Sequence, residues 1–247
     1  DFFYLPINLI KFFLVFVKSL IYIKKNKIDI LLSTGGYMSI PLCLAAKILN
    51  KKIFLFEPNM VIGRSNKFIL KFSNKINCYQ NEIKGLPIKY HDKIYVSQPI
   101  LKREIYNFKK NENSEIKEPL TILILGGSQG AKFFDTTMQK LIINLSNICK
   151  LSVSQQIHDK KNEIKIRKIY EENKIENYLF SFDKSLHNKL NLYDLAITRS
   201  GASTISELAY SSIPFIAVPF PFAKDDHQYF NAKYYFDKNC CWLFEQK

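Results

Sequence analysis

Short apolar runs alternate with helical patterns along almost the whole chain. The helical patterns, in which apolar residues recur every three or four positions, cover residues 39–49, 64–73, 131–144, 160–173, 203–211 and 226–236. The apolar runs indicate buried strands at 28–33, 52–56, 75–79, 93–96, 121–126, 150–154, 178–182, 194–198 and 214–219. This alternation predicts parallel sheets covered by helices on both faces, which is the α/β fold class.

The first 23 residues form the most apolar stretch, yet they make a poor membrane span. Lys11 and Lys18 interrupt the run, whereas a helix needs about 20 apolar residues to cross a bilayer. The stretch predicts a helix that ends in a basic cluster. It is either a core helix of an α/β domain, or a helix whose apolar surface, with Ile10, Phe13 and Phe16, rests on lipid while its lysines reach the headgroups.

A polar, charged segment closed by Pro119 separates two series of strands and helices. It covers residues 107–119, and a new strand follows it directly. We therefore expect an N-terminal domain at 1–106, a linker at 107–119 and a C-terminal domain at 120–247. Because the chain starts at Asp1 and stops just after the strand-like residues 241–244, we expect it to be a fragment of a longer protein.

The charge of the chain is strongly basic and unevenly distributed. It has 36 Lys and Arg against 22 Asp and Glu, a net charge of +14, and most of the excess lies in residues 1–118. Nearly all the basic residues are lysines, which favours attraction to anionic surfaces over sequence-specific reading of nucleic acid by arginine. We expect an anionic membrane surface to meet the first half, and we expect no nucleic-acid partner.

Three loops of the second half join a predicted strand to a predicted helix. In open α/β sheets, ligands bind at such loops because they lie outside the carboxyl ends of the strands. The first loop contains Gly126, Gly127, Ser128 and Gly130. Its glycines and the following helix N-terminus predict either a phosphate cradle or a tight turn, and the sequence is neither a dinucleotide fingerprint nor a P-loop.

The second loop contains Gly201 and is followed by a helix that carries Glu207. Its backbone N–H groups could hold phosphate while Glu207 accepts both hydroxyls of a ribose. The alternative is a helix N-cap with acidic support in the first turn.

The third loop is the rigid Pro219-Phe220-Pro221 segment, which precedes His227 and Gln228. These polar residues are candidates for ligand contact, while Asp225 and Asp226 would cap the next helix in the simpler interpretation. The two acids are adjacent, and the five cysteines lack zinc spacing, so we predict no metal site.

The segments TGGYMSIPLCLAAK, FEPNMVIGRSNK, LGGSQGAKFFD, TRSGASTISELA and VPFPFAKDDHQYFNA occur in this order. Together they resemble the MurG family, the membrane-associated N-acetylglucosaminyltransferases of peptidoglycan synthesis. The similarity covers about residues 28–236, and it implies the GT-B fold, two Rossmann-like domains with parallel sheets facing a central cleft. It further implies inverting transfer of N-acetylglucosamine from UDP-N-acetylglucosamine to the muramyl 4-hydroxyl of lipid I, which gives lipid II.

The resemblance also implies roles for individual residues. Ser128 matches the phosphate-loop serine, Glu207 the ribose ligand, and Asn59 a donor-site asparagine of the first domain. His227 and Gln228 match sugar contacts, and Phe182–Asp183 matches a segment whose backbone contacts uracil. The phosphate and ribose segment comprises Ala202, Ser203, Thr204, Ile205, Ser206 and Glu207.

The implied setting is peripheral attachment to the cytoplasmic face of the inner membrane. The implied partners are lipid I, the anionic membrane surface and cell-wall synthesis proteins. UDP-N-acetylglucosamine is the donor substrate, and no tightly bound cofactor is implied.

This chain departs from the family pattern at four places. Phe56 and Pro58 replace a histidine and a glutamine beside Glu57, and Leu101 replaces an arginine that Lys102 or Arg103 would have to compensate. Lys47 stands where the family has an aromatic residue at the membrane. The family's first glycine-rich loop, with the histidine proposed as general base, would lie upstream of Asp1, which leaves Glu57 as the candidate for orienting or assisting within this chain.

The sequence leaves three alternative functions open. The chain could be another GT-B enzyme, such as a glycolipid glycosyltransferase or a UDP-N-acetylglucosamine epimerase. It could be a catalytically inactive, membrane-bound protein that binds a UDP-sugar, as the lost residues beside Glu57 and at position 101 suggest. A nucleic-acid binder is the weakest alternative, because no recognition motif accompanies the charge.

Overall fold

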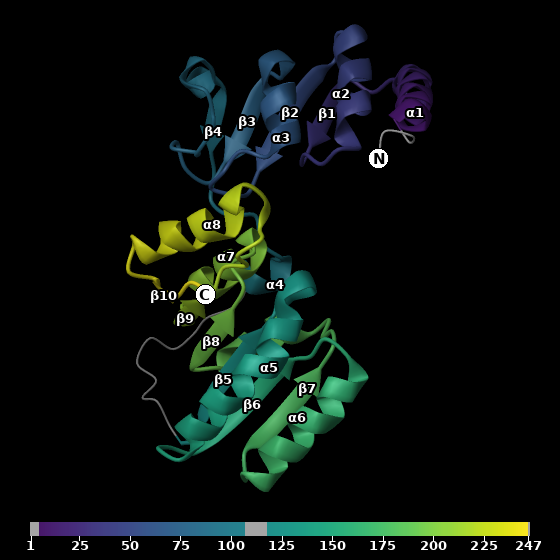
Figure 1. Ribbon diagram of the computed structural model, residues 1–247. Coiled ribbons are helices and arrows are strands. Elements are labelled where there is room, and N and C mark those ends of the chain that lie inside the picture. The colour runs from purple at the N-terminus through teal and green to yellow at the C-terminus, as the bar shows by residue number, and fades with distance from the viewer. Residues whose placement is uncertain (1–4, 107–117, 247) are drawn as a thin grey trace. The chain divides into compact units, whose positions relative to one another are not determined.

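The computed structural model describes residues 5–106 and 118–246, apart from the side chains of residues 5, 6 and 128–131. Contacts between residues divide the chain into two compact units, Asp1–Pro99 and Ile100–Lys247. Each unit has its own sheet of parallel strands with helices packed on it (Figure 1). The predicted α/β fold class is confirmed, and the two units are described separately.

The first unit contains a four-stranded parallel sheet in the order β1-β2-β3-β4. Apolar residues alternate between the two faces of β2, so Ile53 and Leu55 are buried and the sheet has a packed core. The helical segments that follow β2 begin as α-helix and tighten into a 3₁₀ turn within the single helix predicted at 64–73. The strands are β1 (Ile30–Ser33), β2 (Lys52–Glu57), β3 (Lys75–Cys78) and β4 (Ile94–Val96). The helices are α1 (Leu5–Lys25), α2 (Ser39–Ile48), α3 (Arg64–Ile69), η2 (Leu70–Phe72) and η3 (Ile88–Lys93).

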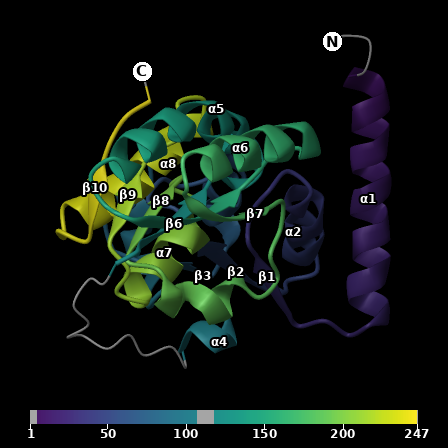
Figure 2. The ribbon, with the colours of Figure 1, turned by 90° about the horizontal axis from the view of Figure 1, so that it is seen from below.

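Helix α1 packs against α2 (Figures 1 and 2). Ser19 and Ile23 are buried, whereas Ile10 and Phe13 are 61% and 62% exposed and Phe16 is half-buried. The helix therefore has one face in the core and a broad apolar face outside it. No helix within the described residues is long and apolar enough to cross a membrane.

The second unit contains a six-stranded parallel sheet in the order β10-β9-β8-β5-β6-β7. The chain winds outward from β5 in one direction through β6 and β7, and in the other through β8, β9 and β10. The strand order therefore reverses between β5 and β8, where the carboxyl ends of the strands leave a crevice for a ligand. The strands are β5 (Leu120–Leu125), β6 (Leu151–Gln156), β7 (Glu176–Phe180), β8 (Leu195–Thr198), β9 (Phe215–Ala217) and β10 (Cys241–Leu243). The helices are α4 (Arg103–Tyr106), α5 (Gly127–Ser146), α6 (Lys160–Glu172), η4 (Leu186–Leu192), α7 (Ala202–Tyr210), η5 (Lys224–Asp226) and α8 (His227–Phe236).

Helices cover both faces of this sheet, and the central strand shows why. Leu123 of β5 packs into a cluster with residues of α7 and α8, including Leu208 and Tyr235. Its neighbours Ile122 and Ile124 point to the opposite face, where they join residues of α5 and α6. A strand buried on both faces must be apolar throughout, which is the pattern that the sequence shows at 122–125.

The boundary between the units falls between Pro99 and Ile100. Leu101 and Ile105, before and within α4, are buried in the core of the second unit beside Leu208. The predicted linker at 107–119 lies outside the described residues except for its last two positions, and it stays a prediction.

Two element boundaries differ from the prediction in ways that matter for the site. Helix α5 begins at Gly127, four residues before the predicted start. The N–H groups of a first helical turn bond to no carbonyl of the helix itself, so a helix can begin at glycine. Strand β7 ends at Phe180, two residues before the predicted end, since the parallel ladder with β6 stops there. Phe182 consequently lies in a loop.

Candidate functional site

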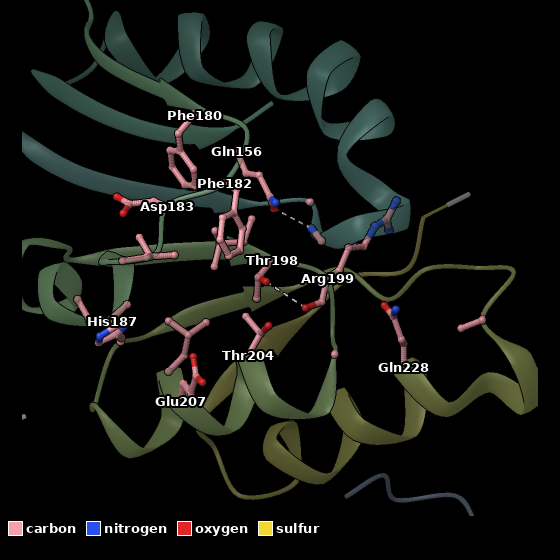
Figure 3. Close-up of a pocket in the computed structure, with 18 of the residues that line it drawn as sticks. Gln156, Phe180, Phe182, Asp183, His187, Thr198, Arg199, Thr204, Glu207 and Gln228 are labelled. Carbon is pink, nitrogen blue, oxygen red and sulfur yellow. Dashed lines mark hydrogen bonds between the residues drawn. The ribbon is translucent and has the colours of Figure 1, made fainter. Parts of the chain in front are cut away.

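A pocket of about 650 Å³ opens at the carboxyl ends of the strands in the second unit. Its residues come from the ends of β5, β6, β7 and β8 and the loops that follow them, from the loop after β9, and from α7 and the start of α8 (Figure 3). The residue before α4 and helix η4 complete the lining. The reversal of strand order between β5 and β8 lies beneath it. The pocket therefore occupies the position where an open α/β sheet binds ligands.

The first predicted loop lies at one side of this pocket. Gly126 and Gly127 are among its lining residues, and Gly127 adopts φ +63°, a left-handed conformation that suits glycine. The Gly127 N–H donates to Oε1 of Gln156, at 3.0 Å, so one donor of the helix N-terminus already points toward a polar group. Ser128 and Gly130 lie in the first turn of α5, where their side chains are not among those described.

The second predicted loop supplies Gly201, Thr204 and Glu207 to the pocket. Thr204 and Glu207 lie three positions apart on α7 and therefore share one helix face. The Ile205 N–H donates to the Gly201 carbonyl at 3.1 Å and makes the first backbone hydrogen bond of α7. The N–H groups before Ile205 therefore have no partner within the helix and lie at the edge of the pocket. Gly201 occupies the N-cap of α7 and has no side chain, so the capping bond of the alternative interpretation is not formed.

The remaining predicted residues of α7 are not brought into the pocket. Ile205 and Ser206 are buried on the opposite face, where the Ser206 hydroxyl lies 2.9 Å from the Tyr235 hydroxyl. Ala202 and Ser203 are not among the lining residues of this pocket. Only their backbone N–H groups belong to the helix terminus that faces it.

The carboxylate of Glu207 is half-buried at the pocket wall. Burial raises its pKa above the ordinary value, and the charges of Lys102 and His187 partly oppose that shift. The influences on this carboxylate include no hydrogen bond from a described residue. It is therefore a desolvated acceptor whose lone pairs face the pocket.

The third predicted loop brings His227 and Gln228 to the pocket. Nδ1 of His227 lies 2.8 Å from the Lys224 carbonyl, which only accepts, so Nδ1 must donate and Nε2 of the neutral ring is left as an acceptor. Oε1 of Gln228 accepts from the N–H groups of Ser200 and Phe220, at 3.2 and 3.0 Å. This amide therefore joins the second and third loops, and its NH₂ group is the part that is left to donate to a ligand.

The expected capping role of Asp225 and Asp226 is only partly realised. Asp226 occupies the N-cap of α8 with φ +54° and makes no side-chain capping bond. Asp225 has a similar left-handed φ of +55°.

Sequence reasoning missed Arg199, which lies behind the loops. Its side chain is 4% exposed, and its guanidinium carbon lies 5.0, 4.9 and 5.5 Å from the ring centres of Phe133, Phe134 and Phe220. Nη1 donates to the carbonyls of Val218 and Pro219, both at 3.0 Å. Desolvation lowers the pKa of Arg199 to about 10. The residue fastens the third loop and α5 to the second loop, and the apolar residues that surround it gave no sequence signal.

Gln156 is a second residue that the sequence did not single out. It ends β6 and lines the pocket, where Oε1 accepts from Gly127 and Nε2 donates to the Ser181 carbonyl, at 3.3 Å. Phe182, predicted to lie in a uracil-contacting segment, is 74% exposed and lines the same pocket. Because β6 already alternates apolar and polar residues, the glutamine at its end gave no distinct sequence signal.

The first unit has polar loops at the carboxyl ends of β1 and β2, but Glu57 is turned inward. It is 3% exposed, and its Oε1 accepts from the N–H and the side-chain amide of Asn59, at 3.2 and 3.0 Å. Oε2 accepts from the Gly63 N–H at 2.7 Å and from Asn66 Nδ2 at 3.0 Å. This carboxylate holds the loop 57–66 together, which favours the orienting role over proton transfer.

No group of three metal-ligating side chains with suitable geometry occurs in the described part of the chain. The pocket instead offers helix N-termini, amides and one desolvated carboxylate. Such groups bind phosphate oxygens and a sugar diol. Two parallel α/β units, one with such a pocket at its strand ends, are typical of the GT-B class of nucleotide-sugar enzymes.

Comparisons with known proteins give the family. The model of the glycosyltransferase family 28 N-terminal domain matches residues 2–78, and that of its C-terminal domain matches residues 121–247. A curated UDP-N-acetylglucosamine–N-acetylmuramyl-(pentapeptide) pyrophosphoryl-undecaprenol N-acetylglucosamine transferase of Pelagibacter ubique is 46% identical over 98% of this chain and 67% of its own length. The enzyme of the same name from Rickettsia felis is 37% identical over 88% of this chain and 63% of its own length.

The fold agrees with that result. The crystal structure of Acinetobacter baumannii MurG matches with a TM-score of 0.76 and 24% identity, over 96% of this chain and 66% of that one. The chain thus spans about two thirds of the length of these relatives. It belongs to glycosyltransferase family 28 and, within it, to the MurG family, as the sequence motifs predicted.

Proposed function

We propose that the protein transfers N-acetylglucosamine from UDP-N-acetylglucosamine to the muramyl 4-hydroxyl of lipid I, which forms lipid II for peptidoglycan synthesis. The observation that carries this proposal is the 46% identity, over nearly the whole chain, to a relative whose name states these substrates. The pocket of the second unit supports it independently, because its polar groups suit a nucleoside diphosphate.

In this proposal the donor lies in the second unit. The N-termini of α5 and α7, with Gly126, Gly127 and Gly201, face the diphosphate, and Ser128 adds its hydroxyl. Glu207 accepts from the ribose hydroxyls, and Phe182 lies against the base. Nε2 of His227 and the NH₂ group of Gln228 contact the transferred sugar. Asn59 remains a predicted donor contact of the first unit.

The reaction follows from these placements. The acceptor oxygen attacks the anomeric carbon from the side opposite the diphosphate, the bond between that carbon and the diphosphate oxygen breaks, and the configuration inverts. The acceptor proton passes to a base, for which the family's upstream histidine is the expected group. Negative charge then grows on the leaving diphosphate, where preorganised N–H donors lower the barrier, and each such donor is worth about 3 kcal/mol.

Membrane attachment is part of the proposal and rests on α1. Its exposed Ile10 and Phe13, with half-buried Phe16, would enter the lipid boundary, while the exposed lysines at its end face anionic headgroups. Each lysine near an anionic leaflet contributes about 1 kcal/mol. The surface would be the cytoplasmic leaflet, where lipid I and cell-wall synthesis proteins are the expected partners.

The test is a transfer assay on the protein with labelled UDP-N-acetylglucosamine and lipid I. We expect labelled lipid II and an equal amount of UDP. Transfer to another glycolipid alone, epimerised donor, or tight UDP binding with no turnover would each replace this proposal with one of its rivals. Liposome flotation tests the membrane part, for which equal binding to neutral and anionic vesicles at low salt would remove the electrostatic contribution.

A further inference from the structure

Two basic side chains line the same pocket as Glu207 and influence its carboxylate. Lys102 precedes α4, and His187 belongs to η4, which packs against α4. Both residues line the pocket, and both act on the Glu207 carboxylate through their charge. Figure 3 shows His187 and Glu207 at the same side of the pocket, on neighbouring elements.

The local structure explains why Lys102 is the residue that reaches the pocket. Leu101, at the position of the arginine expected from the family pattern, is 9% exposed and belongs to the core. Lys102 is exposed and lines the pocket, whereas Arg103, the next residue along, is exposed but is not a lining residue. The structure thus separates two cations that the sequence left equivalent.

His187 carries a buried polar atom that supports the same assignment. Its Nδ1 is inaccessible to solvent and has no hydrogen-bond partner among the described residues. A buried polar nitrogen without a partner is costly, and it is tolerated where charge or a ligand compensates for it. His187 and the Glu207 carboxylate interact through charge.

Resting on the proposed donor site, we propose that Lys102 and His187 are positioning residues that keep Glu207 ionised and oriented toward the ribose of the bound nucleotide. An ionised carboxylate accepts from both hydroxyls of a diol, whereas a protonated one gives up an acceptor position to its own O–H. Burial alone favours the protonated form. Lys102 and His187 partly oppose that preference, which makes donor binding less sensitive to mild acidification than burial alone would.

Other titratable groups line the pocket but are not among the influences on this carboxylate. They are Asp183, Arg199, Lys224 and His227. The pH dependence of the Glu207 interaction is therefore set mainly by the desolvation of Glu207 and by its two basic neighbours.

The test measures the binding of UDP-N-acetylglucosamine by calorimetry between about pH 5 and pH 8, because burial raises the pKa of the Glu207 carboxyl group. This donor is suitable because its diphosphate is esterified at both ends and keeps a constant charge. We expect the parent chain to lose less affinity toward the acid end of the range than the Lys102 variant. Lys102→Met should bind almost normally at about pH 8 and lose about threefold to tenfold at about pH 5, because the pKa of Glu207 rises further.

Three controls make the result specific. Arg103→Met removes the same charge one residue away and should follow the parent profile. His187→Leu should shift the profile in the same direction as Lys102→Met. In a Glu207→Gln background, Lys102→Met should add no pH-dependent loss, because the titrating group is absent.

Two outcomes would overturn the inference. If Lys102→Met weakened binding equally at every pH, the lysine would contact the ligand directly, and if it changed nothing, the lysine would have no role. A parent chain that binds no donor at any pH would instead refute the proposed donor site, so the two failures are distinguishable.

Discussion

Two glutamates at the carboxyl edges of the two sheets have opposite surroundings. Glu57 ends β2 and is buried, and four donors of its own loop fill both carboxylate oxygens. Glu207 lies on α7, where burial raises its pKa and charges rather than hydrogen bonds oppose the shift. A carboxylate saturated by its own loop is structural, whereas one that is desolvated without hydrogen-bond donors is available to a ligand.

Removing the carboxylate of Glu57 should have the largest effect, and the effect should be on folding. Glu57→Ala leaves the N–H of Gly63 and the amide of Asn66 without their acceptor in a buried place, which costs about 3 to 5 kcal/mol of the free energy of unfolding. Glu57→Gln should cost about half as much, since it replaces one acceptor by a donor. Urea unfolding measures both, with exposed Glu82→Ala as the control. An Ala variant as stable as the parent would show that the loop does not depend on this residue.

Removing the carboxylate of Glu207 should affect donor binding instead. Glu207→Ala loses two charge-assisted hydrogen bonds to the ribose, so we expect the KM for UDP-N-acetylglucosamine to rise about a hundredfold. The KM for lipid I should change far less, and the free energy of unfolding should fall little, because no described residue bonds to this carboxylate. Steady-state kinetics with each substrate varied in turn measures the difference. Equal changes in both KM values would count against the ribose role.

Much of the pocket in the second unit could be predicted from the pattern of the chain. The strands, the class of sheet and the three loops of the second unit follow from apolar runs that end at glycine or proline. Gly127, Gly201, Glu207, His227 and Gln228 were all expected at the site, and all five line one pocket.

The rest depends on which side of an element a residue faces and on partners far away in the sequence. Nothing in the segment 56–59 shows that Glu57 turns inward, since its donors include Gly63 and Asn66. Ile205 and Ser206 share a motif with Glu207, yet the turn of the helix directs them to the core. Arg199 is bound by residues 19 and 20 positions ahead, a contact that only the fold creates.

Arg199 tests how far the pocket depends on support from behind. Arg199→Lys keeps the charge but loses the planar fork that reaches Val218, Pro219 and the side chain of Gln246 together. We expect the Kd for UDP-N-acetylglucosamine to rise about tenfold through displacement of the third loop, at a cost of about 1 to 3 kcal/mol of stability. Calorimetry and urea unfolding measure the two effects, and Arg167→Lys at an exposed pair is the control. A stability loss with unchanged affinity would make Arg199 a core residue only.

Asp183 gives the smallest expected effect and a third kind of carboxylate. It lines the pocket, yet Oδ1 accepts from the N–H and hydroxyl of Ser185, at 2.8 and 2.7 Å, and Oδ2 pairs with Lys189 at 2.8 Å. These bonds lower its pKa from 3.8 to about 2. The resulting stabilisation is therefore fully present above about pH 4 and disappears as the pH falls toward 2.

Asp183→Asn should consequently lower the free energy of unfolding by about 1 kcal/mol at neutral pH, and the gap from the parent should narrow steadily below pH 4. Urea unfolding at several pH values measures the gap. The control is Asp29→Asn, whose carboxylate also pairs with a lysine at 2.8 Å but is 83% exposed, so solvent screening leaves a smaller gap. If the difference in the free energy of unfolding between Asp183→Asn and the parent did not depend on pH, the amide would disturb the turn by its shape. The charge of Asp183 would then have no role in stability.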